Sequence, residues 1–185
     1  MRKLRVFDTI SIDGFFTDAK NDMSWAHKQD EEWNAFASDN ASGGGELVFG
    51  RVTYEMMAGF WTSPQAAKTL PKVAEGMNAM GKIVFSRTLN EATWQNTTLI
   101  KGDLVTEVGK LKQQPRPDMT ILGSGSIVSQ LTQARLIDGY QLVVSPIVLG
   151  MGRTLFDTVQ DRLNLKLTQS RAFKNGNVVL WYELS

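Results

Sequence analysis

Two loops of this chain combine glycine, hydroxyl and arginine side chains in a way that suits phosphate binding. In "VFGRVTYE", Gly50 ends an apolar run, Arg51 follows, and Thr53 is expected to cap a helix. In "VFSRTL", Ser86 and Arg87 lie just past another apolar run. Glycine lets a backbone approach a ligand, a guanidinium donates paired hydrogen bonds to phosphate, and the first amides of a helix attract anions.

A third loop of the same kind is "ILGSGSIVSQL", residues 121–131. It places small residues between an apolar run and a helical pattern, namely Gly123, Ser124, Gly125 and Ser126, with Ile127 following. Each loop alone is equally well explained as an ordinary turn, because Gly and Ser serve turns of many kinds. The three together fit one extended polyphosphate ligand, which favours a dinucleotide cofactor.

Two better-known phosphate motifs do not fit this sequence. "GMNAMGKI" has P-loop spacing, but Ile83 replaces the hydroxyl residue that would hold Mg²⁺, and a helix precedes it where a strand is required. Gly123 and Gly125 would need a third glycine at position 128 for a Rossmann fingerprint, and that residue is Val128. We therefore interpret the first segment as the end of a helix and expect a different dinucleotide fold.

The hydrophobic pattern indicates which elements position these loops. Leu4, Val6, Ile10 and Ile12 share one face of a first strand, which is interrupted by Asp8. Strands and helices then alternate, which predicts a mainly parallel sheet covered on both faces. The strands are expected within residues 3–12, 46–50, 82–86, 97–100 and 119–123, and the helices around 30–39, 51–57, 71–80, 104–113 and 126–134.

The C-terminal part follows a different pattern. Apolar segments at 140–150, 163–173 and 178–184 succeed one another without a helix, and "KNGN" between the last two carries the Asn-Gly hairpin signal. The sheet should therefore finish in antiparallel strands. Because no linker or repeat divides the sequence, we expect one domain over residues 1–185.

Composition narrows the possible classes of function. The formal net charge is +1 and the 20 basic residues are dispersed, so neither nucleic acid nor an anionic membrane is expected as a partner. The chain has no cysteine, which excludes disulfides and thiolate chemistry, and no metal site is expected from its single histidine. No segment resembles a signal peptide or a membrane span, so we expect a cytoplasmic protein.

The sequence resembles the dihydrofolate reductase superfamily, and within it the branch that contains the reductase domain of riboflavin biosynthesis. The resemblance is carried by "SIDGFF", "GRVTYE", "FSRTL", "LGSGS" and "SPIVLGMGRTLF", in this order along nearly the whole chain. It implies a three-layer αβα sandwich around a mostly parallel mixed sheet of about eight strands. It also implies NADPH as cofactor and a homodimer, for which Val179 and Trp181 of the last strand are the expected apolar face.

The resemblance assigns each loop a part of NADPH. Gly50, Arg51 and Thr53 would bind the pyrophosphate region, and Ser86 and Arg87 the 2′-phosphate of the adenosine. The residues Gly123, Ser124, Gly125, Ser126 and Ile127 would bind the pyrophosphate and the nicotinamide ribose. A helix beginning in that loop would contribute amide donors and a positive dipole.

The substrate side depends on two candidate acids. The resemblance places Trp25 and Asp30 of "SWAHKQDEEW" at substrate-binding positions, and Asp13, next to Gly14 in "SIDG", is the rival. A carboxyl could protonate a C=N bond while NADPH delivers hydride, if burial raises its pKa. The alternatives are that Asp30 only caps a helix and that Asp13 and Gly14 only form a turn.

These observations favour an NADPH-dependent reductase of a small heterocyclic or ribosylamino substrate. The best single candidate is a reductase of the 5-amino-6-(5-phosphoribosylamino)uracil type. A pteridine or dihydrofolate reductase is the rival enzyme, although Val128 stands where folate reductases carry a tyrosine. A nucleotide-binding paralogue without turnover is the rival from another class, because fold does not fix function.

Overall fold

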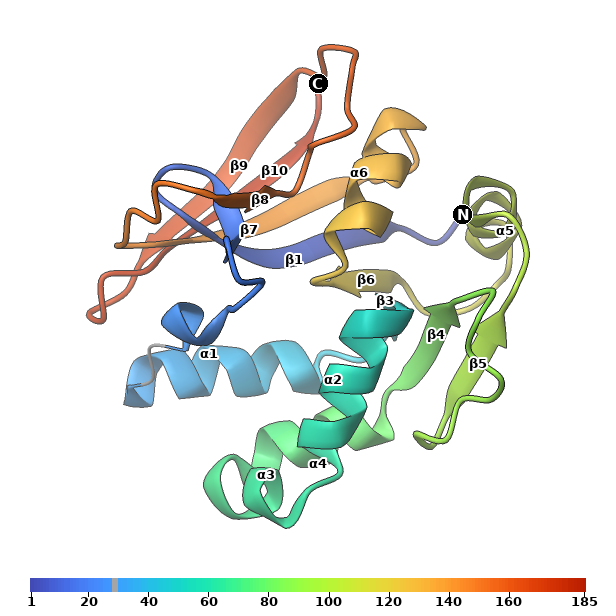
Figure 1. Ribbon diagram of the computed structural model, residues 1–185, viewed down its shortest axis with the longest axis horizontal. Coiled ribbons are helices and arrows are strands. Elements are labelled where there is room, and N and C mark those ends of the chain that lie inside the picture. Colours follow the sequence, from blue (N-terminus) through green and yellow to red (C-terminus); the bar gives the residue numbers. More distant parts are fainter. Residues whose placement is uncertain (28–29) are drawn as a thin grey trace.

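The computed structural model describes residues 1–27 and 30–185 and contains one large sheet flanked by helices (Figure 1). The strands of the large sheet are β1 (Leu4–Ser11), β3 (Glu46–Gly50), β4 (Gly81–Phe85), β5 (Thr97–Ile100), β6 (Met119–Leu122), β7 (Gly139–Ser145), β9 (Leu165–Ala172) and β10 (Val178–Leu184). Two short strands, β2 (Phe15–Asp18) and β8 (Gly152–Thr154), pair separately. The helices are η1 (Ser24–Ala26), α1 (Glu31–Ser42), α2 (Arg51–Trp61), α3 (Pro64–Thr69), α4 (Pro71–Ala79), α5 (Leu104–Lys112) and α6 (Gly125–Gln133).

The eight strands of the large sheet follow the order β5-β4-β3-β6-β1-β7-β10-β9. All neighbours pair in parallel except β10, which is antiparallel to both β7 and β9. The expected mixed sheet with antiparallel final strands is therefore confirmed. The turn in "KNGN" also joins β9 to β10 as expected, with Gly176 at a φ of +90°.

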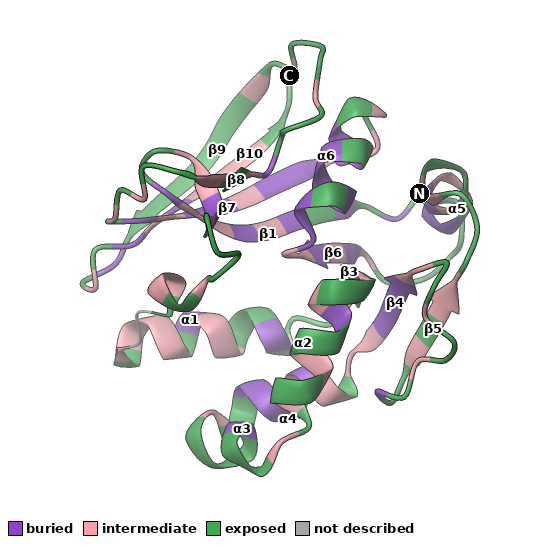
Figure 2. Ribbon diagram, in the orientation of Figure 1, coloured by how far each residue is buried: buried purple, intermediate pink, exposed green. Residues whose placement is uncertain are grey.

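Helices cover both faces of this sheet, which confirms the three-layer architecture. Figure 1 places α1 to α4 on one side of the sheet and α6 on the other. One core joins the sheet to α5 and α6 through residues such as Val108, Ile127 and Val128, and a second joins it to α2 and α4 through Tyr54 and Met77. Buried residues accordingly concentrate in the strands and on the inner sides of the helices (Figure 2). No helix in the described ranges is long and apolar enough to cross a membrane.

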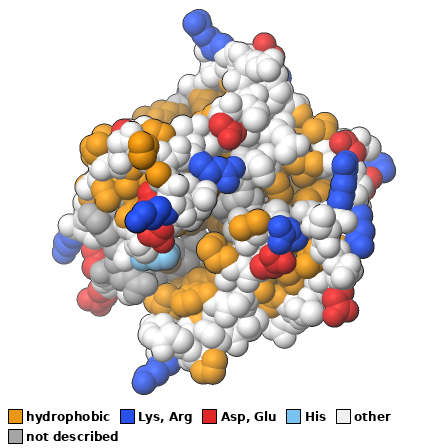
Figure 3. Space-filling model, in the orientation of Figure 1, with side chains coloured by type: hydrophobic (Ala, Val, Ile, Leu, Met, Phe, Trp, Pro, Cys, Tyr) orange, Lys and Arg blue, Asp and Glu red, His pale blue; other side chains and the backbone are white. Residues whose placement is uncertain are grey.

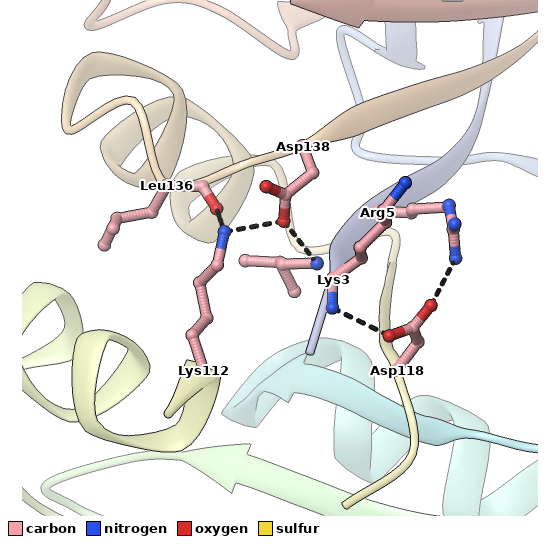
Figure 4. A network of polar contacts seen from close by, with 7 residues as sticks. Lys3, Arg5, Lys112, Asp118, Leu136 and Asp138 are labelled. Carbon is pink, nitrogen blue, oxygen red and sulfur yellow. Dashed lines mark hydrogen bonds and ion pairs between the residues drawn. The ribbon is translucent and has the colours of Figure 1, made fainter. Parts of the chain in front are cut away.

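Side-chain carboxylates hold the central strand β1 between its two neighbours (Figure 4). Asp138, just before β7, accepts a hydrogen bond from the Leu4 amide at 2.7 Å and pairs with Lys112 at 2.6 Å. Asp118, just before β6, pairs with Arg5 at 2.9 Å. These contacts hold the beginning of β1 in place. They therefore help to fix its register against β6, and with it the position of the C-terminal residues of β1.

The pattern missed four short elements, one of which is the 3₁₀ helix η1. The six-residue α3 begins at a Ser63 cap in a segment without a clear period. The strands β2 and β8 pair across more than 130 residues of sequence, and such non-local pairing leaves no local signal. Gly152 permits this pairing, because a Cβ at that position would lie 2.0 Å from the Thr17 carbonyl oxygen.

The expected dimer face on β10 is wrong. Val179 is fully buried, and the Trp181 ring lies 6.2 Å from the ring of Phe36 on α1, so α1 of the same chain covers this face. On β9 and β10, the exposed large apolar side chains are those of Leu167 and Leu184. A homodimer stays a prediction, which the mass measured by light scattering at micromolar concentration tests.

Candidate cofactor site

Two of the three predicted loops form one structure at the C-terminal edge of the sheet. β3 and β6 are neighbours, so the loops that follow Gly50 and Leu122 lie side by side. The Gly50 amide donates a 2.9 Å hydrogen bond to Ser124 Oγ, and a Cβ on Gly123 would lie 3.1 Å from the methyl group of Thr53. Close packing thus explains why small residues are needed here.

The helices that begin in these two loops lack side-chain caps. The Asp30, Ser63 and Asp103 side chains cap α1, α3 and α5. No side chain caps α2, α4 or α6, and α4 differs from the other two in having Pro71 in its first turn. Thr53 does not cap α2, so that prediction is wrong: the N-cap residue is Gly50, and Thr53 lies inside the helix. Each helix therefore presents first-turn amides and a partial positive charge of about half an elementary charge at its start.

The conformation of Ser124 explains why no side chain caps the start of α6. It is the N-cap residue, in the left-handed region with a φ of +60°, and its hydroxyl contacts the Gly50 amide and the Leu122 carbonyl instead of its own helix. The amides of Ile127 and Val128 bond to the Ser124 carbonyl oxygen. Two converging, uncapped helix starts are an arrangement that attracts anions such as a pyrophosphate.

The third predicted loop lies beside the first. Ser86 Oγ accepts hydrogen bonds from the amides of Thr88 and Leu89 at 3.2 and 2.9 Å, which orders the turn after β4. A cavity of about 610 Å³ separates this turn from the start of α2, and it is lined by Arg51, Glu55, Thr88, Leu89, Asn90 and Glu91. Arg51 pairs with Glu55 at 2.8 Å on a half-exposed surface, where such a pair is weak and exchangeable.

Arg87 is an exposed residue of this turn. Hydrogen bonding to Thr106 chiefly lowers the pKa of Asp103, and the charge of Arg87 contributes to the same shift. The three loops thus follow the adjacent strands β4, β3 and β6, as the sequence predicted. The role of their residues in binding a cofactor stays a prediction.

Asp13 does not have the properties of a proton donor. Its carboxylate accepts hydrogen bonds from the amides of Leu149 and Gly150, the latter at 2.7 Å. Together with the Ser11 hydroxyl, which has the largest effect, these amides lower the pKa of Asp13 to about 2. The hypothesis that burial raises the pKa of Asp13 is therefore wrong. The carboxylate instead links the loop before β8 to the end of β1 through hydrogen bonds.

Asp30 occupies the N-cap position of α1, where Oδ1 accepts a 2.7 Å hydrogen bond from the Trp33 amide. Trp25 lies in η1, and its indole nitrogen donates to the Asp22 carbonyl oxygen. Gly14 forms a turn with a φ of +89°, which explains glycine at this position. The structure shows these local roles, and a role of the three residues toward substrate stays a prediction.

The surface above these elements is concave. Figure 3 shows a hollow near the centre of this face, over the region between α1, α2 and the start of α6. Hydrophobic side chains border the hollow, and basic side chains lie close to it. The helices η1 and α1 and the cofactor loops therefore lie on the same face of the molecule.

Comparison with known proteins identifies the family. The model of the RibD C-terminal domain matches residues 2–179. The chain belongs to the RibD C-terminal domain family. It is 28% identical over 174 residues to the uncharacterized protein YyaP of Bacillus subtilis (strain 168), covering 94% of this chain and 90% of YyaP.

Solved structures share the fold of this RibD C-terminal domain. A putative riboflavin biosynthesis protein from Shewanella sp. PV-4 is 21% identical with a TM-score of 0.74, and 99% of each chain is covered. A diaminohydroxyphosphoribosylaminopyrimidine deaminase/5-amino-6-(5-phosphoribosylamino)uracil reductase from Thermotoga maritima is 11% identical with a TM-score of 0.71, covering 100% of this chain and 57% of that one. The resemblance inferred from the motifs is confirmed.

One ionisable residue of this RibD C-terminal domain was missed as a candidate. Asp8 is 4% exposed on β1; its Oδ1 accepts a 2.9 Å hydrogen bond from the Thr9 amide, and its Oδ2 has no partner among the described groups. Burial raises the pKa of Asp8 to about 7, although the Thr9 bond opposes the shift. The sequence did contain a sign of this residue, because Asp8 is the acid that interrupts the apolar face of the first strand.

Asp8 should make the stability of this RibD C-terminal domain pH-dependent. Because its folded-state pKa lies above the ordinary value of 3.8, the folded state holds this proton to higher pH than the unfolded state does. Its contribution to the free energy of unfolding should therefore fall as pH rises from about 4 to about 7, by at most about 4 kcal/mol. Asp8→Asn should remove this fall.

Denaturant unfolding of both proteins at several pH values between 4 and 8 measures the effect. The gain in stability of Asp8→Asn over the wild type should grow with pH. Asp13→Asn serves as a control, because its pKa is already lowered and its charge is stabilising at neutral pH. Parallel stability curves for Asp8→Asn and the wild type would show that Asp8 is not protonated in the folded state at neutral pH.

Proposed function

We propose that this chain is an NADPH-dependent reductase of a small heterocyclic or ribosylamino substrate. The observation that carries the proposal is the convergence of two uncapped helix starts, α2 and α6, beside a cavity lined by Arg51. Two such helix starts suit a pyrophosphate, and the cavity is on the side where an attached adenosine would extend. Membership of the RibD C-terminal domain family supports a reductase-like role.

The order of the strands gives the cofactor a direction. The loop with Ser86 and Arg87 follows β4, the helix starts follow β3 and β6, and β1 comes next. The adenosine 2′-phosphate would lie near Arg87 and the pyrophosphate near Gly50 and Ser124, so the nicotinamide would extend toward β1. Ile127 Cδ1 lies 3.5 Å from the position of a Cβ on Gly50, which makes an apolar wall between the two helix starts.

NADPH would supply the hydride, and this chain would bind and orient both reactants. Trp25, Asp30 and Gly14 belong to the segment expected to contact the substrate. We propose 5-amino-6-(5-phosphoribosylamino)uracil or a related ribosylaminopyrimidine as substrate, because that reductase activity is named for the Thermotoga maritima protein of the same fold. The proposal includes a homodimer in the cytoplasm.

NADPH oxidation assayed with pyrimidine and pteridine substrates tests the function. Turnover of a ribosylaminopyrimidine supports the proposal, and turnover of a pteridine or dihydrofolate alone replaces it by the rival reductase. Tight NADPH binding without oxidation by any substrate of the panel would indicate a nucleotide-binding protein. Absence of NADPH binding would contradict the whole proposal.

Arg87→Ala should change the choice of cofactor. The exposed guanidinium is expected to bind the 2′-phosphate that NADH lacks, through charge-assisted hydrogen bonds. Such bonds contribute about 1.5 kcal/mol at an exposed site, which corresponds to roughly tenfold in affinity. NADPH should therefore bind roughly tenfold more weakly while NADH binding changes little, as titration of both cofactors would measure.

Arg51→Ala is the matched comparison. Because Arg51 lies at the start of α2 beside the expected pyrophosphate, its loss should weaken NADPH and NADH to a similar extent. An unchanged ratio of NADPH to NADH affinity in Arg87→Ala would show that the loop after β4 does not bind the 2′-phosphate.

Asp30→Asn tests the substrate side. Asparagine is as good an N-cap as aspartate, so the variant should keep α1 and fold normally. If the carboxylate protonates or orients the substrate, turnover should fall roughly a hundredfold or more with NADPH affinity nearly unchanged. Steady-state kinetics and cofactor titration measure both quantities, with Asp13→Asn as comparison. Full turnover in both variants would leave protonation to solvent.

A further inference from the structure

Asp8 lies at the point where β1 extends beyond its neighbour β6. The pairing of β1 with β6 ends at Phe7 and Leu122, whereas its pairing with β7 continues to Ser11 and Ser145. The segment that follows β6 leads to α6 on one face of the sheet. The segment that follows β1 leads to α1 on the opposite face. A crevice at such a reversal is the usual ligand site of open α/β sheets.

The side chain of Asp8 lies on the α6 face of the sheet. Strand residues alternate between faces, and Val6 and Ile10 on either side of Asp8 pack in the core that contains Ile127 and Val128 of α6. Asp8 and Gly123 directly follow Phe7 and Leu122, the last pair between β1 and β6. Asp8 is therefore beside the beginning of the loop that contains Gly123 and Ser124.

A buried polar atom without a partner calls for an explanation. Leaving such a group unpaired costs about 1–3 kcal/mol, and most buried polar atoms in folded proteins are hydrogen-bonded. Asp8 Oδ2 has no hydrogen-bond partner among the described groups, although Oδ1 has one. Oδ2 therefore has the capacity for one further hydrogen-bond partner.

We propose that the side chain of Asp8 binds the carboxamide of the nicotinamide ring. The inference rests on the proposed function, in which the dinucleotide runs from β4 across β3 and β6 to β1. A neutral carboxyl and a primary carboxamide are complementary, because each offers one donor and one acceptor. The Oδ2 hydroxyl would donate to the carboxamide oxygen, and Oδ1, which can accept a second bond, would accept from the amide nitrogen.

The charge state of Asp8 gives the interaction a pH dependence. Since burial raises the pKa of Asp8 to about 7, the donor is present below neutral pH and is lost as pH rises above it. The other ionisable side chains on the elements packed against this face are Tyr140 on β7, Tyr182 on β10, Glu46 on β3, Asp18 on β2, Arg153 on β8, and Glu107, Lys110 and Lys112 on α5, with none on β6 or α6. Burial also raises the pKa of Tyr140 above its ordinary value of 10, away from the range in which Asp8 titrates.

The experiment compares NADPH with 2′-phosphoadenosine diphosphate ribose, a fragment that has the adenosine, the 2′-phosphate and the pyrophosphate but no nicotinamide. Calorimetric affinities of both ligands are measured at pH 6 and pH 8.5 for the wild type, Asp8→Leu and Asp8→Asn. Titration of the 2′-phosphate affects both ligands, so the ratio of the two affinities isolates the nicotinamide end. Asp39→Leu, which replaces an exposed aspartate on α1, is the matched control.

In the wild type, the preference for NADPH over the fragment should fall roughly tenfold between pH 6 and pH 8.5, as expected for the loss of about one hydrogen bond. Asp8→Leu should show the reduced preference at both pH values. Asp8→Asn should keep the high preference at both, because an amide offers the same donor and acceptor without titrating. Asp39→Leu should behave as the wild type.

Several outcomes would overturn the inference. A wild-type preference that does not change with pH, or equal effects of Asp8→Leu on both ligands, would show that Asp8 does not bind the nicotinamide end. Fragment binding without any additional affinity for NADPH would have the same meaning and would leave the nucleotide site in place. Absence of binding by both ligands would instead contradict the proposed function itself.

Discussion

The arrangement of the candidate site depends on the parallel pairing of β3 with β6. This pairing brings the starts of α2 and α6 together, and the hydrogen bond from the Gly50 amide to Ser124 Oγ joins the two loops directly. Any side chain on Gly123 would crowd Thr53, and any on Gly125 would crowd Phe16, so the loop must stay small. Both constraints keep the first-turn amides of the two helices close together and uncapped.

The parts of the fold that the sequence predicted are those with a local signal. Alternating strands and helices, the reversal into antiparallel strands and the Asn-Gly turn all follow from periodicity and turn chemistry over a few residues. The β2–β8 pair and the position of α1 against β10 depend on contacts between distant segments, so they carry no such signal. The same limit explains why Trp181 was expected to face a partner and instead packs on Phe36.

Three aspartates, Asp8, Asp13 and Asp30, show how far residue type can predict a role. Asp13 and Asp30 were candidates because of their motifs, yet backbone amides hold Asp13 as a carboxylate and Asp30 caps a helix. Asp8 has no motif, but it is buried on a strand face that is otherwise apolar. Burial and hydrogen bonding decide a carboxyl group's pKa, and neither can be known before the strands are placed beside one another.

The electrostatic character of the sheet edge changes along the strand order, and this change matches the proposed ligand. From β4 to β6 the edge carries Arg87, Arg51 and two positive helix starts, whereas at β1 it carries a buried acid that is uncharged at low pH. The charge of a dinucleotide such as NADPH varies in a matching way along its length, because the phosphates lie toward one end and the uncharged dihydropyridine ring lies at the other. A neutral Asp8 adds no repulsion to the anionic part of the ligand. Its burial destabilises the chain at high pH and keeps the carboxyl mainly neutral below about pH 7.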